Sequence, residues 1–212
     1  MKTVIFDFDG TIADTLPAIL KLFNVHAKEF GFEKLSDKDV SSLADLTPFQ
    51  ILRKYGIKLI KLPFLANKVR VDLGRVIKKV PIFPAMKEVI LSLNKKGYRL
   101  GILSSNSKRN VEEFLKLHGI FVFDFIHSEQ NLLAKGNALK RLLKIYRISV
   151  SDTVYIGDEV RDIDASRKNG MRIISVAWGF NHRKILTENE PDFIADTPDD
   201  IIEALEKIFP TA

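Results

Sequence analysis

The chain has 212 residues, 46% of them hydrophobic and 28% charged, with a net charge of +6, and these values are typical of a soluble globular protein. The length suffices for one α/β domain and a smaller second domain, and no apolar run approaches the roughly 20 residues that cross a membrane. The sequence contains no cysteine, which excludes disulfides and thiolate metal sites.

The first predicted element is a short buried strand that leads into acidic residues. Residues 4–8 form an apolar run that is interrupted by Asp7 and followed by Asp9. Residues two apart on a strand project to the same side, so both carboxylates face one way while the strand lasts. Burying two unpaired like charges is costly, so a cation or water must be near them. Gly10 then lets the backbone turn and approach a ligand closely, and Thr11 adds a hydroxyl.

Residues 15–80 are predicted to form helices throughout. Apolar residues keep helical spacing in stretches that begin near Asp14, Ser36, Thr47 and Pro63. Capping residues or prolines mark these starts. No stretch within these limits has the pattern of a strand.

From Pro81 onward the pattern changes to alternating helices and strands. Strands are predicted at residues 98–103, 123–126, 154–156, 172–176 and 193–195. Alternating βα units predict a parallel sheet with helices on both faces and right-handed crossovers. We therefore expect an α/β fold with a Rossmann-like core formed by residues 1–14 and 81–212, and a small all-helical domain formed by residues 15–80. In such sheets, ligands bind beyond the carboxyl ends of the strands.

The second strand runs into polar residues that suit a phosphate. Ser104, Ser105 and Asn106 follow it directly, at the start of a predicted helix. Hydroxyl groups and free N–H groups at such a place can bind a phosphate. Residues of this kind more often simply cap the helix, and the spacing alone leaves both interpretations open.

The strand at residues 154–156 ends in a second group of acids. Asp158 and Asp162 are four residues apart and share a face if the helix has already begun. Acids favour the first turn of any helix, so capping is again the alternative. The recurrence of acids at the end of a second buried strand nevertheless indicates one acidic site. Glu159 and Arg161 are expected to form a solvated pair.

The segment from Asp7 to Thr11 resembles the first signature of the haloacid dehalogenase superfamily of phosphatases and phosphotransferases. The polar residues at the other strand ends follow in the order of the later signatures of that family. The resemblance implies that Asp7 is the nucleophile and that Asp9 is the general acid and base. Ser104 would bind the transferring phosphoryl group. Further phosphate-binding residues are expected to be Gly10, Thr11, Ser105, Asn106 and Lys135.

The resemblance also implies a role for one lysine and a binding site for one metal ion. Lys135 would neutralise the nucleophile and the phosphate, although without the resemblance it is better interpreted as a surface residue. Mg²⁺ would be bound by a carboxylate oxygen of Asp7, the backbone carbonyl of Asp9, and Asp158. Asp162 would lie just outside this set and orient metal-bound water or Lys135.

The resemblance covers nearly the whole chain and gives the helical segment a role. Residues 15–80 fall between the first and second signatures, where some family members carry a helical cap domain. The most similar group is the phosphoglycolate-phosphatase-like hydrolases, which implies hydrolysis of a small phosphorylated metabolite through an aspartyl-phosphate. Basic cap residues are candidates for selecting that metabolite, namely Arg53, Lys54, Lys68 and Arg70. The sequence indicates neither the exact ester nor the oligomeric state.

Three alternative functions are weighed against this one. A phosphomutase would use the same core residues, and the sequence does not separate it from a phosphatase. A haloacid dehalogenase is disfavoured because it does not need Asp9. A non-catalytic binding or regulatory module is disfavoured because it has no reason to keep clustered carboxylates.

The remaining features indicate partners and location. The 33 Lys and Arg residues are spread along the chain without a long basic block, which favours an anionic small substrate over nucleic acid. The acid at position 7 interrupts any apolar signal segment, so no membrane partner and a cytoplasmic location are expected. The four histidines have no metal-ligand spacing and are interpreted as structural or surface residues.

Overall fold

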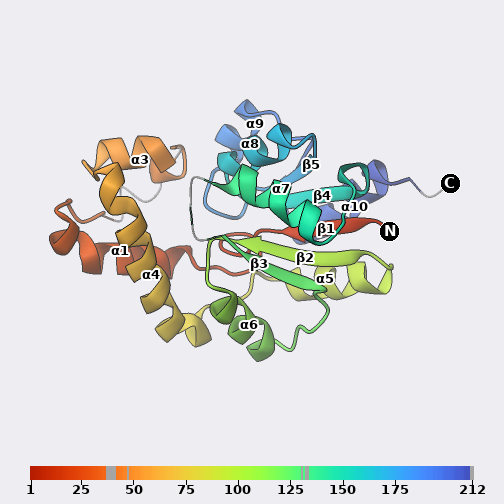
Figure 1. Ribbon diagram of the computed structural model, residues 1–212, viewed down its shortest axis with the longest axis horizontal. Helices are drawn as coiled ribbons and strands as arrows, with labels where there is room; N and C mark the ends of the chain where they lie inside the picture. The colour runs from red at the N-terminus through yellow and green to blue at the C-terminus, as the bar shows by residue number, and fades with distance from the viewer. Residues whose placement is uncertain (37–41, 47, 130, 132–133, 211–212) are drawn as a thin grey trace.

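The computed structural model describes the chain except for residues 37–41, 47, 130, 132–133 and 211–212. Its centre is a six-stranded parallel sheet with the strand order β3-β2-β1-β4-β5-β6 (Figure 1). The strands are β1 (Thr3–Phe6), β2 (Arg99–Ser104), β3 (Phe125–Ser128), β4 (Thr153–Gly157), β5 (Arg172–Val176) and β6 (Phe193–Ala195). The predicted α/β fold with a parallel sheet is confirmed.

Helices cover both faces of the sheet, as the alternating pattern predicted. One face packs against α5 (Met86–Lys95), α6 (Lys108–Leu117) and α10 (Pro198–Ile208). The other face packs against α7 (Lys135–Ile145), α8 (Val160–Lys168) and α9 (Arg183–Glu188). Figure 1 shows α7, α8 and α9 on one side of the strands and α5 and α6 on the opposite side.

The central strand β1 shows why its sequence is apolar without alternation. Val4 and Phe6 belong to the core on one face of the sheet, and Ile5 belongs to the core on the other face. All three side chains are completely buried. A strand with neighbours on both sides and helices on both faces has no solvent-facing position, so every residue in it is apolar or small.

Three longer helices lie to one side of the sheet and have their own small core. They are α1 (Leu16–Phe30), α3 (Pro48–Lys54) and α4 (Leu62–Val76) (Figure 1). Short 3₁₀ turns occur at Leu59–Lys61 and Ile77–Lys79, next to α4, and at Val150–Asp152, before β4. Phe30, Leu52, Leu65 and Val69 pack together in the helical part without any residue of the sheet. The described residues between 15 and 80 contain no strand.

The two segments that join the helical part to the sheet run side by side. Ala13 and Ile82 form an antiparallel bridge, and the Asp14 N–H donates to the Pro81 carbonyl at 3.0 Å. The Phe83 N–H donates to the Ile12 carbonyl at 3.1 Å. The connection is therefore a short two-stranded neck, and one of its two segments starts at Pro81, where the sequence pattern changes.

Some boundaries differ from the prediction. The helix predicted to start at Ser36 falls mostly on residues 37–41, and the capping residue Thr47 likewise lies outside the described residues. The strand predicted at 123–126 begins two residues later, at Phe125, because residues 121–124 form a loop in which the Asp124 N–H bonds to the Leu100 carbonyl.

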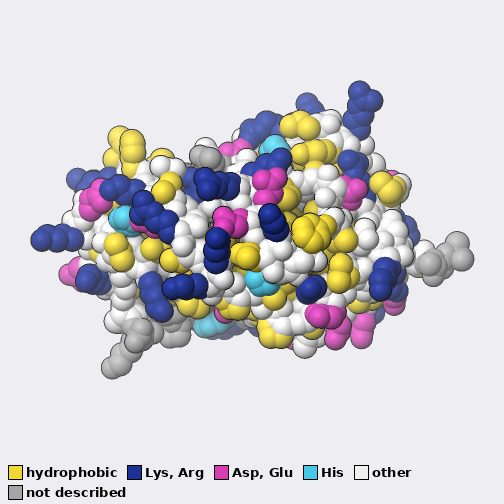
Figure 2. Space-filling view, turned by 90° about the horizontal axis from the view of Figure 1, so that it is seen from below, with side chains coloured by type: hydrophobic (Ala, Val, Ile, Leu, Met, Phe, Trp, Pro, Cys, Tyr) yellow, Lys and Arg dark blue, Asp and Glu magenta, His cyan; other side chains and the backbone are white. Residues whose placement is uncertain are grey.

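The surface and the helices add two observations. Within the described residues, no helix is both long enough and apolar enough to span a membrane. On the face shown in Figure 2, Lys and Arg side chains are scattered among acidic and hydrophobic ones instead of forming one continuous patch.

Candidate active site

The polar residues singled out in the sequence meet at one edge of the sheet. β2, β1 and β4 are adjacent and parallel, so their carboxyl ends lie next to each other. Asp7 directly follows β1, Ser104 ends β2, and Asp158 directly follows β4. Ligands of parallel sheets bind at this edge because the loops there leave the strands and open a crevice.

Lys135 lies between two acids at this edge. Its Nζ is 2.5 Å from Asp7 Oδ2, and it also pairs with Asp162 Oδ1. The lysine is the first residue of α7 and is only 8% exposed, so it is not the surface residue that its sequence context alone suggested. The ammonium group thus offsets part of the charge of two buried carboxylates.

Three buried carboxylates form a cluster that suits a hard cation. Oxygen atoms of Asp7, Asp158 and Asp162 lie within 4.8 Å of one another. Lys135 supplies one positive charge against these three, so a divalent cation would balance the remainder. Oxygen ligands of this kind favour Mg²⁺ or Ca²⁺ over softer metals. Among the described residues this is the one such group, and it includes no histidine.

The carboxylate of Asp158 is fixed by the chain around it. Thr11 Oγ1 donates to its Oδ1 at 2.8 Å, and the Phe180 N–H donates to its Oδ2 at 2.7 Å. Gly10 and Gly179 approach so closely that a Cβ on either would lie 2.1 or 2.3 Å from an atom of Asp158. Thr11 is predicted to bind phosphate, and in the structure its buried hydroxyl donates to Asp158.

Asp9 is held separately from the three clustered acids. Its carboxylate accepts a hydrogen bond from Asn106 Nδ2 at 3.0 Å and one from Ser104 Oγ at 3.4 Å. Ser104 Oγ also accepts the Asn106 N–H at 2.9 Å. These contacts join the end of β2 to the loop after β1 and leave Asp9 only partly buried, at the mouth of the site.

The structure separates the two interpretations of the serines after β2. Ser107 is the N-cap of α6, and its side chain accepts the Asn110 N–H at 3.1 Å. Capping is therefore done by Ser107. Ser104 lies nearer the acids, and Ser105 and Asn106 line the pocket above them.

Burial shifts the pKa values of the ionisable groups in the site. Desolvation raises the pKa of Asp7 to about 7, against the opposing effect of Lys135. Desolvation also raises the pKa of Asp158 well above its ordinary value and raises that of Asp9. Burial lowers the pKa of Lys135, but the neighbouring Asp162 and Asp7 outweigh it, and the net shift is strongly upward. Without a cation, the site therefore favours neutral acids and a charged lysine.

The prediction that Glu159 and Arg161 form a solvated pair is wrong in one respect. They do form an ion pair, but their side chains are only 12% and 20% exposed. Glu159 is the N-cap of α8, where its side chain and that of Asp162 form a reciprocal capping box. Because α8 starts at Val160, Asp158 precedes the helix, and it reaches the site from the loop after β4.

Asn181 is a functional candidate that the sequence analysis missed. It is completely buried, and its Oδ1 accepts the Val160 N–H of α8 at 2.9 Å. Its Nδ2 donates to the carbonyls of Ala44 at 2.9 Å and Leu46 at 3.3 Å, in the helical part. One amide thus connects the helix that carries Asp162 to the helical part of the chain. The available signal was the position of residues 177–181 after β5, at the same edge of the sheet.

Arg70 is the basic residue of the helical part that reaches the site. It is 8% exposed, and its Nε donates to the Ser105 carbonyl at 2.9 Å. Burial lowers its pKa while the charge of Asp9 opposes that shift. The other three candidates point elsewhere: Arg53 is exposed, Lys54 bonds to Ser42, and Lys68 pairs with Glu29.

A pocket of about 510 Å³ lies between the sheet edge and the helical part. At one end it is lined by Asp9, Lys135, Asp158 and Arg70, and at the other by apolar residues of α1 and α4. The candidate site is therefore a crevice with a charged end and an apolar end.

Comparison with known proteins shows which family this chain matches and which proteins are similar to it. Residues 4–176 match the family model described as haloacid dehalogenase-like hydrolase. A phosphoglycolate phosphatase from Synechococcus elongatus is 33% identical over 209 residues, which cover 98% of this chain and 99% of that protein. A pyrophosphatase from Bacillus mycoides is 22% identical over 98% of both chains.

Solved structures show the same fold. A structure described as a predicted phosphatase from Clostridium acetobutylicum matches with a TM-score of 0.84 and 20% identity, over 97% of this chain and 98% of the other. A haloacid dehalogenase-like hydrolase from Streptococcus pneumoniae matches with a TM-score of 0.80 and 21% identity, again over 97% and 98%.

We expect Asn181→Ala to destabilise the protein strongly. The substitution leaves the Val160 N–H and the Leu46 carbonyl without this partner, at about 1–3 kcal/mol for each buried group left unpaired, while the Ala44 carbonyl keeps its hydrogen bond from the His182 N–H. Urea denaturation measures the loss. Asn189→Ala is the matched control, because Asn189 Nδ2 bonds to the Ile185 carbonyl within its own helix. Equal losses in both variants would contradict the linking role of Asn181.

The metal-free protein should become less stable as the pH rises toward neutrality. The pKa of Asp7 is about 7 in the folded protein against an ordinary value of 3.8, so the unfolded chain releases this proton first. Stability therefore falls between these two pH values. Urea denaturation in a chelator at pH 5 and pH 7.5 measures the decline, which Asp7→Asn should reduce. An unchanged decline in that variant would show that Asp7 is not responsible.

Proposed function

Because this chain belongs to the haloacid dehalogenase-like hydrolase family and its relatives include phosphatases that match it along its whole length, we propose that it is a Mg²⁺-dependent phosphomonoester hydrolase. The observation that carries this proposal is the placement of Asp7. This acid follows the central strand, contacts Lys135 and belongs to the carboxylate cluster, while Asp9 is held apart from that cluster.

In the proposed first step, an oxygen of Asp7 attacks the phosphorus atom of the ester. The bond from phosphorus to the alcohol oxygen breaks, and Asp9 gives its proton to that oxygen. This forms an aspartyl-phosphate on Asp7. The raised pKa of Asp9 supports its role as the acid, since it keeps the proton available nearer to neutral pH.

In the proposed second step, water hydrolyses the aspartyl-phosphate. Asp9, now ionised, removes a proton from the attacking water, and phosphate leaves with Asp7 restored. Lys135 stays charged throughout because its pKa is well above neutrality. It would hold the phosphoryl oxygens together with Ser104, and Ser105 and Asn106 lie close enough to assist.

The residues present fit a magnesium ion. Asp7, Asp158 and the backbone carbonyl of Asp9 would hold it, with Asp162 orienting Lys135 and water. When bound, the ion supplies positive charge against the phosphoryl oxygens and favours ionised Asp7. The rigid surroundings of Asp158 support this role, because a carboxylate fixed by Thr11 and Phe180 keeps one position.

We further propose that residues 15–80 act as a cap over a core of residues 1–14 and 81–212. The separate core of α1, α3 and α4, together with the neck at Ala13 and Ile82, supports a part that can move as a unit. Arg70 would contribute to recognising the substrate from this cap. The full-length phosphoglycolate phosphatase relative supports a small phosphorylated metabolite as the class of substrate.

Removal of the metal should abolish activity. We expect no release of nitrophenol from p-nitrophenyl phosphate in excess chelator and full recovery with Mg²⁺. Ca²⁺ should fail to restore it, because its larger and looser coordination shell disturbs the in-line geometry. Full activity in chelator would refute the metal-dependent mechanism.

The Asp9→Asn variant should separate the two steps. General acid–base help is typically worth about 10²–10⁴-fold, and an activated aryl ester hardly needs the acid in the first step. With p-nitrophenyl phosphate we therefore expect a burst of about one nitrophenol per enzyme, followed by slow turnover, with phosphate retained on Asp7.

Two variants control this experiment. Asp7→Asn should show neither burst nor turnover. Asp164→Asn changes an exposed acid that lines the same pocket and should behave as the parent protein. Steady turnover of Asp9→Asn without a burst would show that Asp9 is not the base.

A further inference from the structure

The apolar end of the pocket is larger than a two-carbon substrate needs. Pockets of roughly 300–1,000 Å³ hold ligands of drug size, and this one measures about 510 Å³. The phosphoryl group would occupy only the end near Asp9, Lys135 and Asp158. The remaining volume extends between α1 and α4.

The walls of that remaining volume are apolar, and several of the side chains that form them are only partly buried. They include Leu16, Ile19, Leu20 and Phe23 of α1, and Leu62 and Ala66 of α4. On each helix these residues recur at intervals of three or four, so they lie along one face. The apolar surface that they leave exposed is therefore turned, at least in part, toward the pocket.

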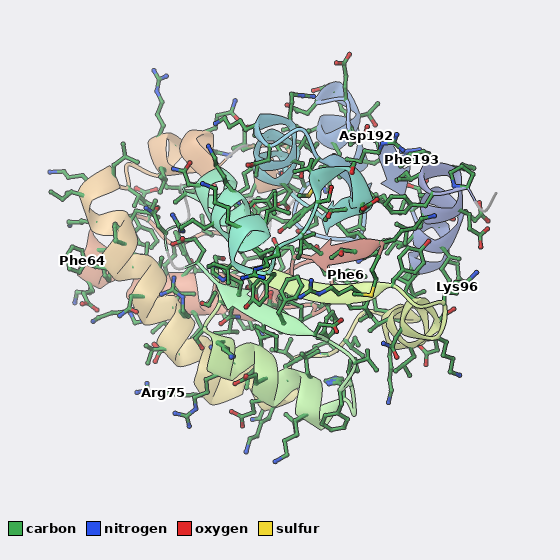
Figure 3. All side chains as sticks on the ribbon, turned by 45° about the vertical axis from the view of Figure 1, so that its right-hand side comes forward. Phe6, Phe64, Arg75, Lys96, Asp192 and Phe193 are labelled. Atoms are coloured by element: carbon green, nitrogen blue, oxygen red, sulfur yellow. The ribbon has the colours of Figure 1, made fainter. Side chains whose placement is uncertain are left out.

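Charged groups are confined to the core side and to the phosphoryl end of this pocket. Among the described residues of α1, α3 and α4 that line it, Arg70 is the one with a charge, and Arg70 lies against Ser105. At the apolar end of the pocket, these described helix residues therefore provide no charge that could bind a second anionic group of the substrate. Figure 3 shows that the labelled Phe64, near the start of α4, lies at the outer edge of the cap, and its side chain is 68% exposed.

We propose that the substrate is a phosphate monoester whose alcohol carries a compact apolar group, which binds between α1 and α4. This inference rests on the proposed phosphatase function and narrows its class of substrate. The phosphoryl group binds at the charged end, and Arg70 contributes to that end. The apolar group removes the partly exposed side chains from water, which is favourable by about 0.8 kcal/mol per buried methylene, or about fourfold in affinity.

Binding of n-alkylphosphonates, which are not hydrolysed, tests the proposal without relying on turnover. Calorimetry on the full chain with Mg²⁺ should give a Kd that falls about fourfold per methylene from ethyl to hexyl, or about 250-fold over the four added methylenes. A negative heat-capacity change that grows with chain length is also expected. A Kd that is flat or rises with chain length would overturn the proposal.

Turnover of the matching alkyl phosphates is measured in parallel, with phosphoglycolate as the small acidic comparator. The value of kcat/KM should rise with chain length, and hexyl phosphate should exceed phosphoglycolate. A preference for phosphoglycolate over every alkyl ester would overturn the inference. A third outcome separates the two proposals: no ester, including p-nitrophenyl phosphate, is hydrolysed, but the affinity for alkylphosphonates still rises with chain length. In that case the phosphatase mechanism is wrong, and the binding of an apolar group between α1 and α4 is retained.

Substitutions in the pocket test where the alkyl chain binds. Ala66→Phe places a ring in the apolar end and should remove the gain from butyl to hexyl while leaving ethylphosphonate binding unchanged. Val25→Phe adds the same ring at a position of α1 that is 69% exposed and does not line the pocket, so it should change nothing. Ala66→Leu provides a smaller intrusion if the phenylalanine variant is unstable. An undiminished chain-length dependence in both Ala66 variants would overturn the assigned position.

Discussion

The site depends on the burial of three carboxylates around one ammonium group. Asp7, Asp158 and Asp162 come from three different places in the chain, and their oxygens converge within 4.8 Å beside Lys135. Removing such charges from water is unfavourable, and one lysine does not balance three acids. Desolvation by burial is the main cause of the raised pKa values of Asp7 and Asp158, and the charge of neighbouring acids raises them further. A sequence that keeps these acids together is explained best by a cation and an anionic substrate that share the charge.

The surrounding backbone is arranged to hold these acids in place. Thr11 and the Phe180 N–H fix Asp158, and the capping box of Glu159 fixes one oxygen of Asp162. The loops after β1 and β5 approach Asp158 so closely that only glycine fits at positions 10 and 179. Rigid surroundings reduce the reorganisation that would otherwise accompany the build-up of charge during phosphoryl transfer.

Two of the buried polar side chains that join the helical part to this edge lie beside the site. Asn181 reaches from the core to the carbonyls of Ala44 and Leu46, and Arg70 reaches from α4 to the Ser105 carbonyl. Both contacts involve loops that also support the acids or the phosphate-binding residues. The position of the proposed cap and the shape of the charged end are therefore connected through these hydrogen bonds, and a change in one can alter the other.

The sequence by itself determined the fold class and the central acids. Continuous apolar runs of strand-forming residues, such as residues 4–6, are typical of buried strands, and acids or serines at the ends of adjacent strands meet because parallel strands present their carboxyl ends at one edge. The sequence pattern alone therefore places Asp7, Ser104 and Asp158 at one edge of the sheet. Local patterns sufficed because each of these signals lies within a few residues of a strand.

Only the tertiary structure decided which partner each side chain takes. Thr11 bonds to Asp158, 147 residues away, and Asn181 bonds to Ala44, 137 residues away. Lys135 is one of 33 basic residues, and nothing in its neighbours marks it as buried between two acids. Likewise, the sequence around Arg70 does not distinguish it from Arg53, Lys54 and Lys68. The packing of α4 directs the Arg70 side chain toward the site. Contacts between residues so distant in sequence depend on how the cap packs against the sheet edge, and periodicity within a single element carries no information about that packing.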